Sequence, residues 1–326
     1  MQYVVRHLTR FVYTAPVSES VMELRMQPLD REDQRCLQFN IETSQRAKVF
    51  AYRDHRNNAV HYFDVPGHHG KLDVTVKSIV EVTPMPDVPR RIADDTWTEL
   101  DAVTAAGTYL DWQLPGYFTT PTEALHQFAR TISLDREQDP LSTLRELNTT
   151  LYQQFAYEPR TTNVDSMIDE ALRARAGVCQ DFAHIMAALV RGLGIPCRYV
   201  SGYIAPQESR FDRAGDNATH AWIEAWLPQL GWVGFDPTNN TVAGHRHIAV
   251  AVGRDYDEVP PTRGVYKGGA GSQLSVAVSV TPDTNAAPPR ELSPRVSWIA
   301  PPRAVQSTAD EDALAQHQQQ EQQQQQ

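Results

Sequence analysis

The first 85 residues alternate between apolar and polar side chains with a period of two, the pattern of half-buried β-strands. The alternation is cleanest over 37–42 and runs without interruption over 72–82. Turn-forming residues separate the apolar runs at 55–58 and at 66–70. Five or more short strands of this kind predict an antiparallel sheet or a β-sandwich, and we assign residues 1–85 to an N-terminal β domain.

Closely spaced prolines end this pattern, and residues 86–120 are expected to form a connector. From residue 121 the apolar residues recur every three or four positions, which is the spacing of an amphipathic helix. The spacing predicts helices over 122–132 and 140–155 and a shorter helix over 166–174. We therefore expect a layer of helices in this part of the chain.

Cys179 begins the most apolar of the predicted helices. Apolar side chains follow Phe182 at offsets of three, four, seven and eight, and the glycines and proline of 192–196 end the pattern. Cys179 should therefore lie in a first helical turn, where unpaired N–H groups and the positive end of the helix dipole stabilise a thiolate. A cysteine in such a helix is also commonly a small buried hydrophobic residue, so Cys179 alone does not define a site.

Strands are expected after this helix. They fall at 198–204, 219–227, 231–238, 247–252 and 273–281. Helices followed by an antiparallel sheet indicate an α+β domain, which we assign to residues 121–282. The tail over 283–326 is rich first in proline and then in glutamine. We expect this tail to be disordered because it cannot bury enough apolar surface.

His220 and Asp236 lie on two neighbouring predicted strands that are joined by a three-residue loop. If the loop pairs Leu227 with Gly231, Asp236 lies diagonal to His220 on the same face, with Cβ atoms roughly 7 Å apart. A cysteine nucleophile needs a base and a third group that orients the base, and Cys179, His220 and Asp236 supply these types. Strand structure explains the histidine or the aspartate taken singly, so their combination favours a catalytic site.

Composition narrows the class of function. The length of 326 residues predicts two folded domains and a tail, and the formal net charge of -10 argues against a nucleic-acid or anionic-membrane partner. Cys36, Cys179 and Cys197 form neither a disulfide framework nor the paired spacing of a zinc site. We therefore expect a reducing compartment, no metal and no cofactor. Because no segment resembles a signal peptide or a membrane span, we expect a cytoplasmic protein.

Three blocks of the sequence resemble the core motifs of the bacterial transglutaminase-like superfamily. They are Gly177-Val178-Cys179-Gln180-Asp181-Phe182-Ala183-His184, Thr219-His220-Ala221-Trp222 and Gly231-Trp232-Val233-Gly234-Phe235-Asp236-Pro237-Thr238. The segments 155–159 and 253–261 also resemble members with an N-terminal β region, so the resemblance covers about residues 1–282. It implies a transglutaminase-like core of the papain-like cysteine proteinase fold, preceded by a β-sandwich-like domain. By position it implies Cys179 as nucleophile, His220 as base and Asp236 as the group that orients the base.

The resemblance specifies the fold more narrowly than the reaction, because the superfamily includes cross-linkers, cysteine peptidases, amidases and inactive members. We expect a cysteine peptidase or amidase that hydrolyses a protein or peptide through a thioester. The alternatives are transfer of the acyl group to an amine and a binding or scaffold module with a relic triad. Arylamine N-acetyltransferases share the order of the three residues, but the N-terminal β region and the tryptophan-rich strands argue against them. The substrate, the acyl acceptor and the oligomeric state stay open.

Trp222, Trp232 and Asp255 are weaker candidates for contacts with a substrate. The tryptophans could shield a thioester from water, although packing in the sheet explains either one alone. Asp255 could line the site or pair with an arginine. Asp181 is expected to cap the helix of the candidate nucleophile, and His184 is expected to pack inside the domain.

Overall fold

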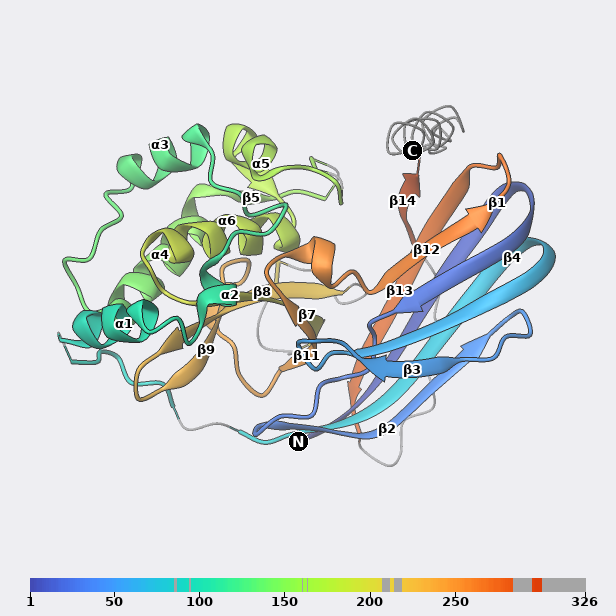
Figure 1. Cartoon of the computed structure of the whole chain (residues 1–326), viewed down its shortest axis with the longest axis horizontal. Coiled ribbons are helices and arrows are strands. Elements are labelled where there is room, and N and C mark those ends of the chain that lie inside the picture. The colour runs from blue at the N-terminus through green and yellow to red at the C-terminus, as the bar shows by residue number, and fades with distance from the viewer. Residues whose placement is uncertain are drawn as a thin grey trace, which may run out of the picture.

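The computed structural model describes residues 1–84, 87–93, 95–159, 161–162, 164–206, 212–213 and 219–283, and the backbone of the strand at 295–300. Figure 1 shows a strand-rich body beside a body of mixed helices and strands. Both large sheets are antiparallel in the pairs formed by their strands, so the α+β prediction with a β-rich N-terminal region is confirmed. No helix among the described residues has the length and apolar character that a membrane span requires.

Two long strands, β1 (Gln2–Leu24) and β4 (Ala59–Val82), form the middle of a seven-stranded sheet. The pairing of β1 with β4 shifts register between Val12 and Glu19, which divides both strands into two successive halves. The remaining strands of this sheet pair with one half or the other. They are β2 (Gln34–Thr43), β3 (Phe50–Arg53), β12 (Thr262–Lys267), β13 (Ser272–Pro282) and β14 (Arg295–Ala300).

The first sheet encloses its own hydrophobic core. Buried side chains from both halves belong to one cluster, and no helix contributes to it. The cluster includes Met22, Leu24, Phe63 and Val65 from one half and Leu72, Val74 and Val76 from the other. This arrangement agrees with the expected β-sandwich-like domain, although its strands form a single hydrogen-bonded sheet.

Sequence order and spatial order differ in this sheet. The turn predicted at 66–70 lies inside β4, where Gly67 takes a positive φ of 90° near the register shift, so the turn signal marks an irregular strand. Residues 262–282 belong to the stretch assigned from sequence to the α+β domain of 121–282, yet they form β12 and β13 and pair with β1 of the first sheet. Part of the expected disordered tail forms β14, while residues 284–294 and 301–326 lie outside the described residues.

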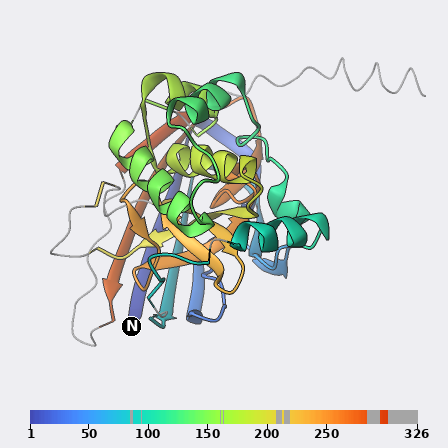
Figure 2. The ribbon, with the colours of Figure 1, turned by 90° about the vertical axis from the view of Figure 1, so that its left-hand side faces the viewer.

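The second body consists of helices on a five-stranded antiparallel sheet. Its strand order is β10-β9-β8-β7-β11. The strands are β7 (Cys197–Ile204), β8 (His220–Leu227), β9 (Gly231–Asp236), β10 (Thr241–Val242) and β11 (His247–Gly253). A short 3-10 turn, η1 (Tyr256–Glu258), follows β11. Figure 2 shows the helices lying in front of the strands.

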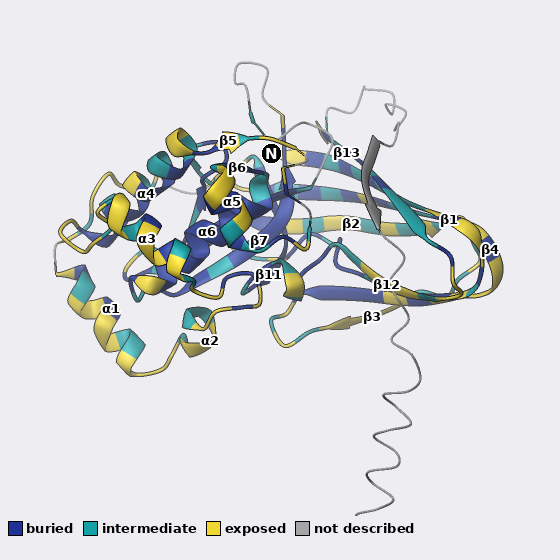
Figure 3. Ribbon diagram, turned by 90° about the horizontal axis from the view of Figure 1, so that it is seen from above, coloured by how far each residue is buried: buried dark blue, intermediate teal, exposed yellow. Residues whose placement is uncertain are grey.

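The predicted helices are confirmed. They are α3 (Glu123–Thr131), α4 (Pro140–Gln154), α5 (Ile168–Ala174) and α6 (Cys179–Gly192). Nearly all of α6 is buried, as its dark colour in Figure 3 shows, because it packs between the other helices and β7 and β8. The central helix and the sheet therefore form one continuous core.

The connector predicted over 86–120 contains two helices that the sequence pattern did not predict, α1 (Thr96–Ala105) and α2 (Leu110–Gln113). Leu100 is the only apolar side chain of α1 that is fully buried, so the sequence carries little helical periodicity there. Trp97 adds a tertiary anchor by donating from Nε1 to the carbonyl of Gln138 at 2.7 Å. Tertiary contacts of this kind stabilise a helix whose local pattern is weak.

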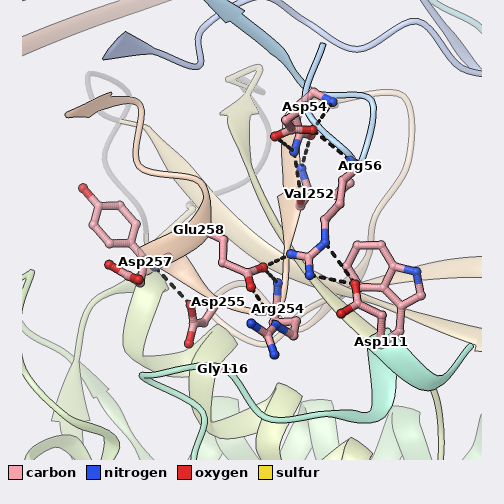
Figure 4. A network of polar contacts seen from close by, with 12 residues as sticks. Asp54, Arg56, Asp111, Gly116, Val252, Arg254, Asp255, Asp257 and Glu258 are labelled. Carbon is pink, nitrogen blue, oxygen red and sulfur yellow. Dashed lines mark hydrogen bonds and ion pairs between the residues drawn. The ribbon is translucent and has the colours of Figure 1, made fainter. Parts of the chain in front are cut away.

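A buried polar network joins the two bodies at the loop between β3 and β4. The side chain of Arg56 is only 4% exposed, and its guanidinium lies 4.7 Å from the centre of the Trp112 ring. Figure 4 shows Arg56 between Asp111 and Glu258. It donates to Asp111 Oδ2 at 2.7 Å and forms an ion pair with Glu258. The N-terminal sheet is therefore held against the helical body by paired charges.

Candidate active site

A two-residue parallel pairing fixes the chain immediately before Cys179. β5 (Ala156–Tyr157) lies beside β6 (Ala176–Gly177), and Glu158 donates from its backbone N–H to the Gly177 carbonyl at 3.0 Å. A Cβ on Gly177 would lie 2.6 Å from Oδ2 of Asp181, so only glycine fits there without a shift. The chain therefore enters α6 in a defined direction.

Asp181 caps the start of α6, as predicted. Its Oδ2 accepts the backbone N–H of Val178 at 2.8 Å and the hydroxyl of Thr162 at 2.6 Å. Burial raises the pKa of Asp181, and the hydrogen bonds from Thr162 and Val178 oppose this rise. Cys179 is the first residue of the helix and is half-buried, which leaves its sulfur near free N–H groups and within reach of solvent.

The hairpin of β8 and β9 has the predicted register. Leu227 pairs with Gly231, so the end of β9 lies beside the start of β8. Nε2 of His220 lies 2.8 Å from Oδ2 of Asp236, and both side chains are almost fully buried. An imidazole and a carboxylate from residues 16 apart thus meet through strand pairing alone.

The protonation of this pair is set by its own charges. Burial alone would lower the pKa of His220, but the charge and hydrogen bond of Asp236, with a smaller effect of Cys179, raise that pKa far above its usual value. Burial would raise the pKa of Asp236, but His220 and then His247 hold it far below its usual range. The pair therefore favours an imidazolium beside a carboxylate, and Cys179 is close enough to influence His220.

Asp236 accepts more hydrogen bonds than sequence reasoning anticipated. Its Oδ1 accepts the backbone N–H groups of Thr238 and Asn239 at 3.1 and 3.2 Å, and its Oδ2 accepts Nδ2 of Asn239 at 2.8 Å. His247 adds a contact from Nε2 to Oδ2 at 3.2 Å. The short turn after Asp236 could have been found from the Asp-Pro signal, but nothing local marks His247.

His220, Asp236 and His247 also offer the ligand types of a metal site, with atoms within 4.8 Å of one another. The position of the proton on the His247 ring argues against a metal site. The backbone N–H of Gly244 donates to Nδ1 of His247 at 3.2 Å, so the neutral ring carries its proton on Nε2 and donates it to Asp236. A metal ligand nitrogen must be unprotonated, so this arrangement fits a hydrogen-bonded relay.

The structure brings Trp222 to this cluster and places the other weak candidates elsewhere. The Trp222 ring is fully buried and stacks 6.1 Å from the ring of His220. Trp232 pairs with Trp226 near the hairpin turn and lies under the guanidinium of Arg198, 4.2 Å from its ring centre. Its position at the opposite end of β9 from the carboxylate fits packing in the sheet.

Asp255 is fully buried and holds backbone. Its Oδ2 accepts the N–H of Phe118 at 2.7 Å, and its Oδ1 accepts the N–H of Asp257 at 3.1 Å. His184 packs inside the domain, as predicted, with its ring stacked 5.3 Å from Phe118 and its Nε2 accepting the Tyr256 N–H at 3.1 Å. Burial lowers the pKa of His184 to about 3, so it stays neutral.

Two tyrosines near Cys179 were not singled out from the sequence. Tyr157 pairs with Gly177 of β6, and Tyr199 lies on β7. Burial raises the pKa of both hydroxyls, and Cys179 is the next largest cause in each case. The candidate nucleophile is therefore close enough to both tyrosines, as to His220, to influence their pKa values.

Comparisons with known proteins agree with this architecture. The sequence profile of the transglutaminase-like superfamily matches residues 127–237, and that of the bacterial transglutaminase-like N-terminal region matches residues 3–81. An uncharacterized protein of Mycobacterium leprae is 33% identical over 278 residues, covering 85% of this chain and 97% of that protein. An uncharacterized protein of Mycobacterium tuberculosis is 34% identical over 302 residues, covering 86% of this chain and 93% of that protein.

Two further similarities bear on fold and on part of the sequence. The crystal structure of a candidate cysteine protease from Cytophaga hutchinsonii has a TM-score of 0.66 at 18% identity, covering 89% of this chain and 94% of that one, which shows a shared fold. A protein-glutamine gamma-glutamyltransferase of Pseudomonas aeruginosa is 37% identical over 95 residues, which cover 27% of this chain and 14% of that protein.

Proposed function

This chain belongs to the transglutaminase-like superfamily, and on that premise we propose that it is a thiol enzyme that cleaves amide bonds. The observation that carries the proposal is the buried 2.8 Å contact between Nε2 of His220 and Asp236, next to a half-buried Cys179 at a helix start. These are the nucleophile, base and orienting group that amide cleavage through a thioester requires.

The proposed mechanism assigns a different task to each ring nitrogen of His220. Asp236 engages Nε2 of His220, while Nδ1 has no hydrogen-bond partner among the described residues. Nδ1 is thus available to take the thiol proton of Cys179, which gives a thiolate beside an imidazolium. The thiolate attacks the amide carbonyl carbon, and backbone N–H groups at the start of α6, including that of Cys179, stabilise the oxyanion. His220 then gives its proton to the leaving amine, and a thioester to Cys179 remains.

Hydrolysis of the thioester by water completes the reaction that we favour, with a protein or peptide as substrate. His220, neutral again, removes a proton from the attacking water. Because a thiolate nucleophile is lost on oxidation, we propose that the enzyme works under reducing conditions such as those of the cytoplasm. The free state of Cys36, Cys179 and Cys197 is consistent with this proposal.

Transfer of the acyl group to an amine is the second candidate. The match to part of a protein-glutamine gamma-glutamyltransferase supports it, since the same thioester would serve both reactions. The two outcomes differ only in the acceptor, water or an amine. Incubation of peptide amides with and without an added primary amine, followed by mass spectrometry of the products, separates them.

Alkylation by iodoacetamide tests the thiolate that both reactions need. Peptide mass spectrometry distinguishes Cys179 from the other cysteines, whose pKa values are raised chiefly by burial, to about 11 for Cys36 and about 12 for Cys197. At pH 6.5 we expect Cys179 to react roughly tenfold or more faster than a free thiol, of which only about 1% is ionised at that pH. His220→Gln should remove most of this advantage while keeping a donor to Asp236.

The opposite result is equally clear. If Cys179 in the folded wild type reacts no faster than a free thiol, and His220→Gln reacts at the same rate, the thiol-enzyme proposal fails. A binding or scaffold role with a relic triad would then be the better explanation. Capture of protein partners by the N-terminal sheet would be the next measurement.

A further inference from the structure

The strand β11 is the open edge of the catalytic sheet, and side chains of the N-terminal sheet cover that edge. The amide of Gln34 pairs with Ala249 in both directions, accepting its N–H at 2.8 Å and donating to its carbonyl at 2.8 Å. The amide of Asn58 pairs with Val252 in the same way, at 2.8 and 2.9 Å. Both amide side chains are almost completely buried.

These two carboxamides take the place of a neighbouring strand, together with the backbone N–H of Leu29, which donates to the Ala249 carbonyl at 2.9 Å. An edge strand presents unpaired N–H and C=O groups, which are costly to bury without partners. The register of β11 against β7 shifts between Ala249 and Ala251, so Ala249 and Val252, three residues apart, both face the outer edge. β11 is therefore fixed on its inner side by β7 and on its outer side by the first sheet.

His247 is the first residue of β11 and connects that strand to the candidate site. Its ring is 5% exposed, and both of its nitrogens are used: Nδ1 accepts from Gly244 and Nε2 donates to Asp236. The indole of Trp222 packs against it edge-on, with ring centres 5.1 Å apart. A ring held at both nitrogens and on one face has a single orientation.

His247 restrains the Asp236 carboxylate from one side. Without His247, Oδ2 would keep two donors, Nε2 of His220 and Nδ2 of Asn239. The third donor comes from a different strand and approaches the carboxylate from the side of β11. It restrains rotation of the carboxylate, and with it the ring of His220, which depends on Oδ2 for its own orientation.

We propose that His247 is a positioning residue for the Asp236 carboxylate, and that the N-terminal sheet holds the strand that carries it through Gln34 and Asn58. This inference rests on the proposed function, because it concerns how the candidate triad is aligned. It assigns a task to the N-terminal domain: that domain secures the geometry of a carboxylate in the other body without touching it.

A simpler explanation must be separated from this one. His247 could serve only to close the turn at Gly244, by accepting its N–H through Nδ1. Two variants of similar size distinguish the roles, because an asparagine oxygen can take the place of Nδ1 and a glutamine nitrogen the place of Nε2. His247→Asn can keep the bond from Gly244 and lose the donor to Asp236. His247→Gln can keep the donor and lose the bond from Gly244.

Two readouts are measured on the full-length variants. One is the alkylation rate of Cys179 at pH 6.5. The other is the proton NMR signal of Nε2–H of His220, which lies far downfield when this group bonds to a buried carboxylate and does not depend on thiol chemistry. We expect His247→Gln to retain both. We expect His247→Asn to lose most of the alkylation advantage, to shift or broaden the signal, and to lower kcat on the order of 100-fold with little change in KM.

The outcomes are decisive. Retention of both readouts in His247→Asn, or their loss in both variants while thermal unfolding stays cooperative, overturns the proposal. Failure of the proposed function looks different, because wild-type Cys179 would then react as a free thiol. The NMR signal would still report whether His247 aligns Asp236 and His220.

A separate pair of matched variants tests the role of the N-terminal sheet. Gln34→Met removes both side-chain hydrogen bonds to Ala249 and a third to the Leu29 carbonyl at 2.7 Å, whereas Gln38→Met alters an exposed side chain of the same strand. We expect Gln34→Met to shift the His220 signal and slow alkylation of Cys179 several-fold, and Gln38→Met to change neither. Identical behaviour of the two variants would show that the sheet does not act on the site through β11.

Discussion

Asp236 and Arg56 are each the centre of a buried polar network, and the two networks are built differently. Around Asp236 the partners are imidazoles and a carboxamide, and the cluster ends at His220, whose Nδ1 is unpartnered among the described residues. Around Arg56 the partners are carboxylates that remain partly exposed, 53% for Asp111 and 20% for Glu258. The first network contains histidines, whose rings can gain or lose a proton, whereas the second holds a permanent charge.

This difference shows that burial of charge is not itself a sign of catalysis. Both networks satisfy the rule that buried charges are paired. Only the first combines a titratable base, an orienting carboxylate and a neighbouring nucleophile that reaches solvent. We expect variants of the first network to change reactivity far more than stability and variants of the second to do the reverse.

The largest expected effect is that of Asp236→Asn. The amide keeps the size of the carboxylate but cannot stabilise the imidazolium of His220, so kcat should fall by a factor on the order of 10⁴. Turnover of a peptide amide that the wild type cleaves measures the change. Asp255→Asn is the matched control, since Asp255 is equally buried but holds only backbone N–H groups. Similar losses in both variants would argue that any buried aspartate here acts through folding alone.

Arg56→Met should have the next largest effect, and it should act on stability. The variant removes the cation from the partly exposed Asp111 and leaves Glu258 with Arg254 alone, which should lower the free energy of unfolding by about 2 kcal/mol. Denaturant titration measures this loss. The alkylation rate of Cys179 should stay at the wild-type value, because Gln34 and Asn58 still hold β11. Slower alkylation of Cys179 in a stably folded Arg56→Met variant would show that the two networks are coupled.

The smallest effect is the pH dependence of the pair formed by His220 and Asp236. The pKa of His220 is raised by folding, so its contribution is complete below its unfolded value near 6.5 and is lost as pH rises through the folded value. The pKa of Asp236 is lowered, so its contribution is complete above about 4 and is lost as pH falls. The stability difference between wild type and His220→Gln should therefore be largest between about pH 4 and 6.5.

Above that window the difference should shrink by at most about 1.4 kcal/mol per pH unit, since one proton is involved. Urea unfolding at pH 5.5, 7.5 and 9 measures it. A difference that grows with pH would mean that His220 is neutral in the folded protein, and the imidazolium would have to be abandoned.

The sequence predicted the local parts of the site because they depend on short-range rules. The period of the strands and a three-residue loop placed Asp236 beside His220, and apolar spacing with a glycine stop placed Cys179 at a helix start. His247 escaped prediction because its contact depends on the path of the chain between β10 and β11. Gln34 and Asn58 escaped for a stronger reason, since their partners lie 215 and 194 residues away.

Distance along the sequence also limited what could be predicted of the fold. Each strand of the N-terminal sheet can be recognised from alternation, but alternation does not state which strand is its neighbour. β13 carries the pattern of an ordinary strand, and its pairing with β1 brings together the two ends of the described chain. The helix α1 was missed because one buried leucine, Leu100, gives no period.

The pairing of β1 with β13, from Tyr3 with Pro282 to Tyr13 with Ser272, makes the helical body an insertion within a single sheet. During synthesis, β1 and β4 emerge first, and the outer edge of β1 stays open until residues 262–282 have been made. An open edge of this length is a template for unwanted association, so the nascent chain is most exposed to aggregation while the helical body is being translated. A protein truncated before residue 262 would keep this edge of β1 unpaired permanently.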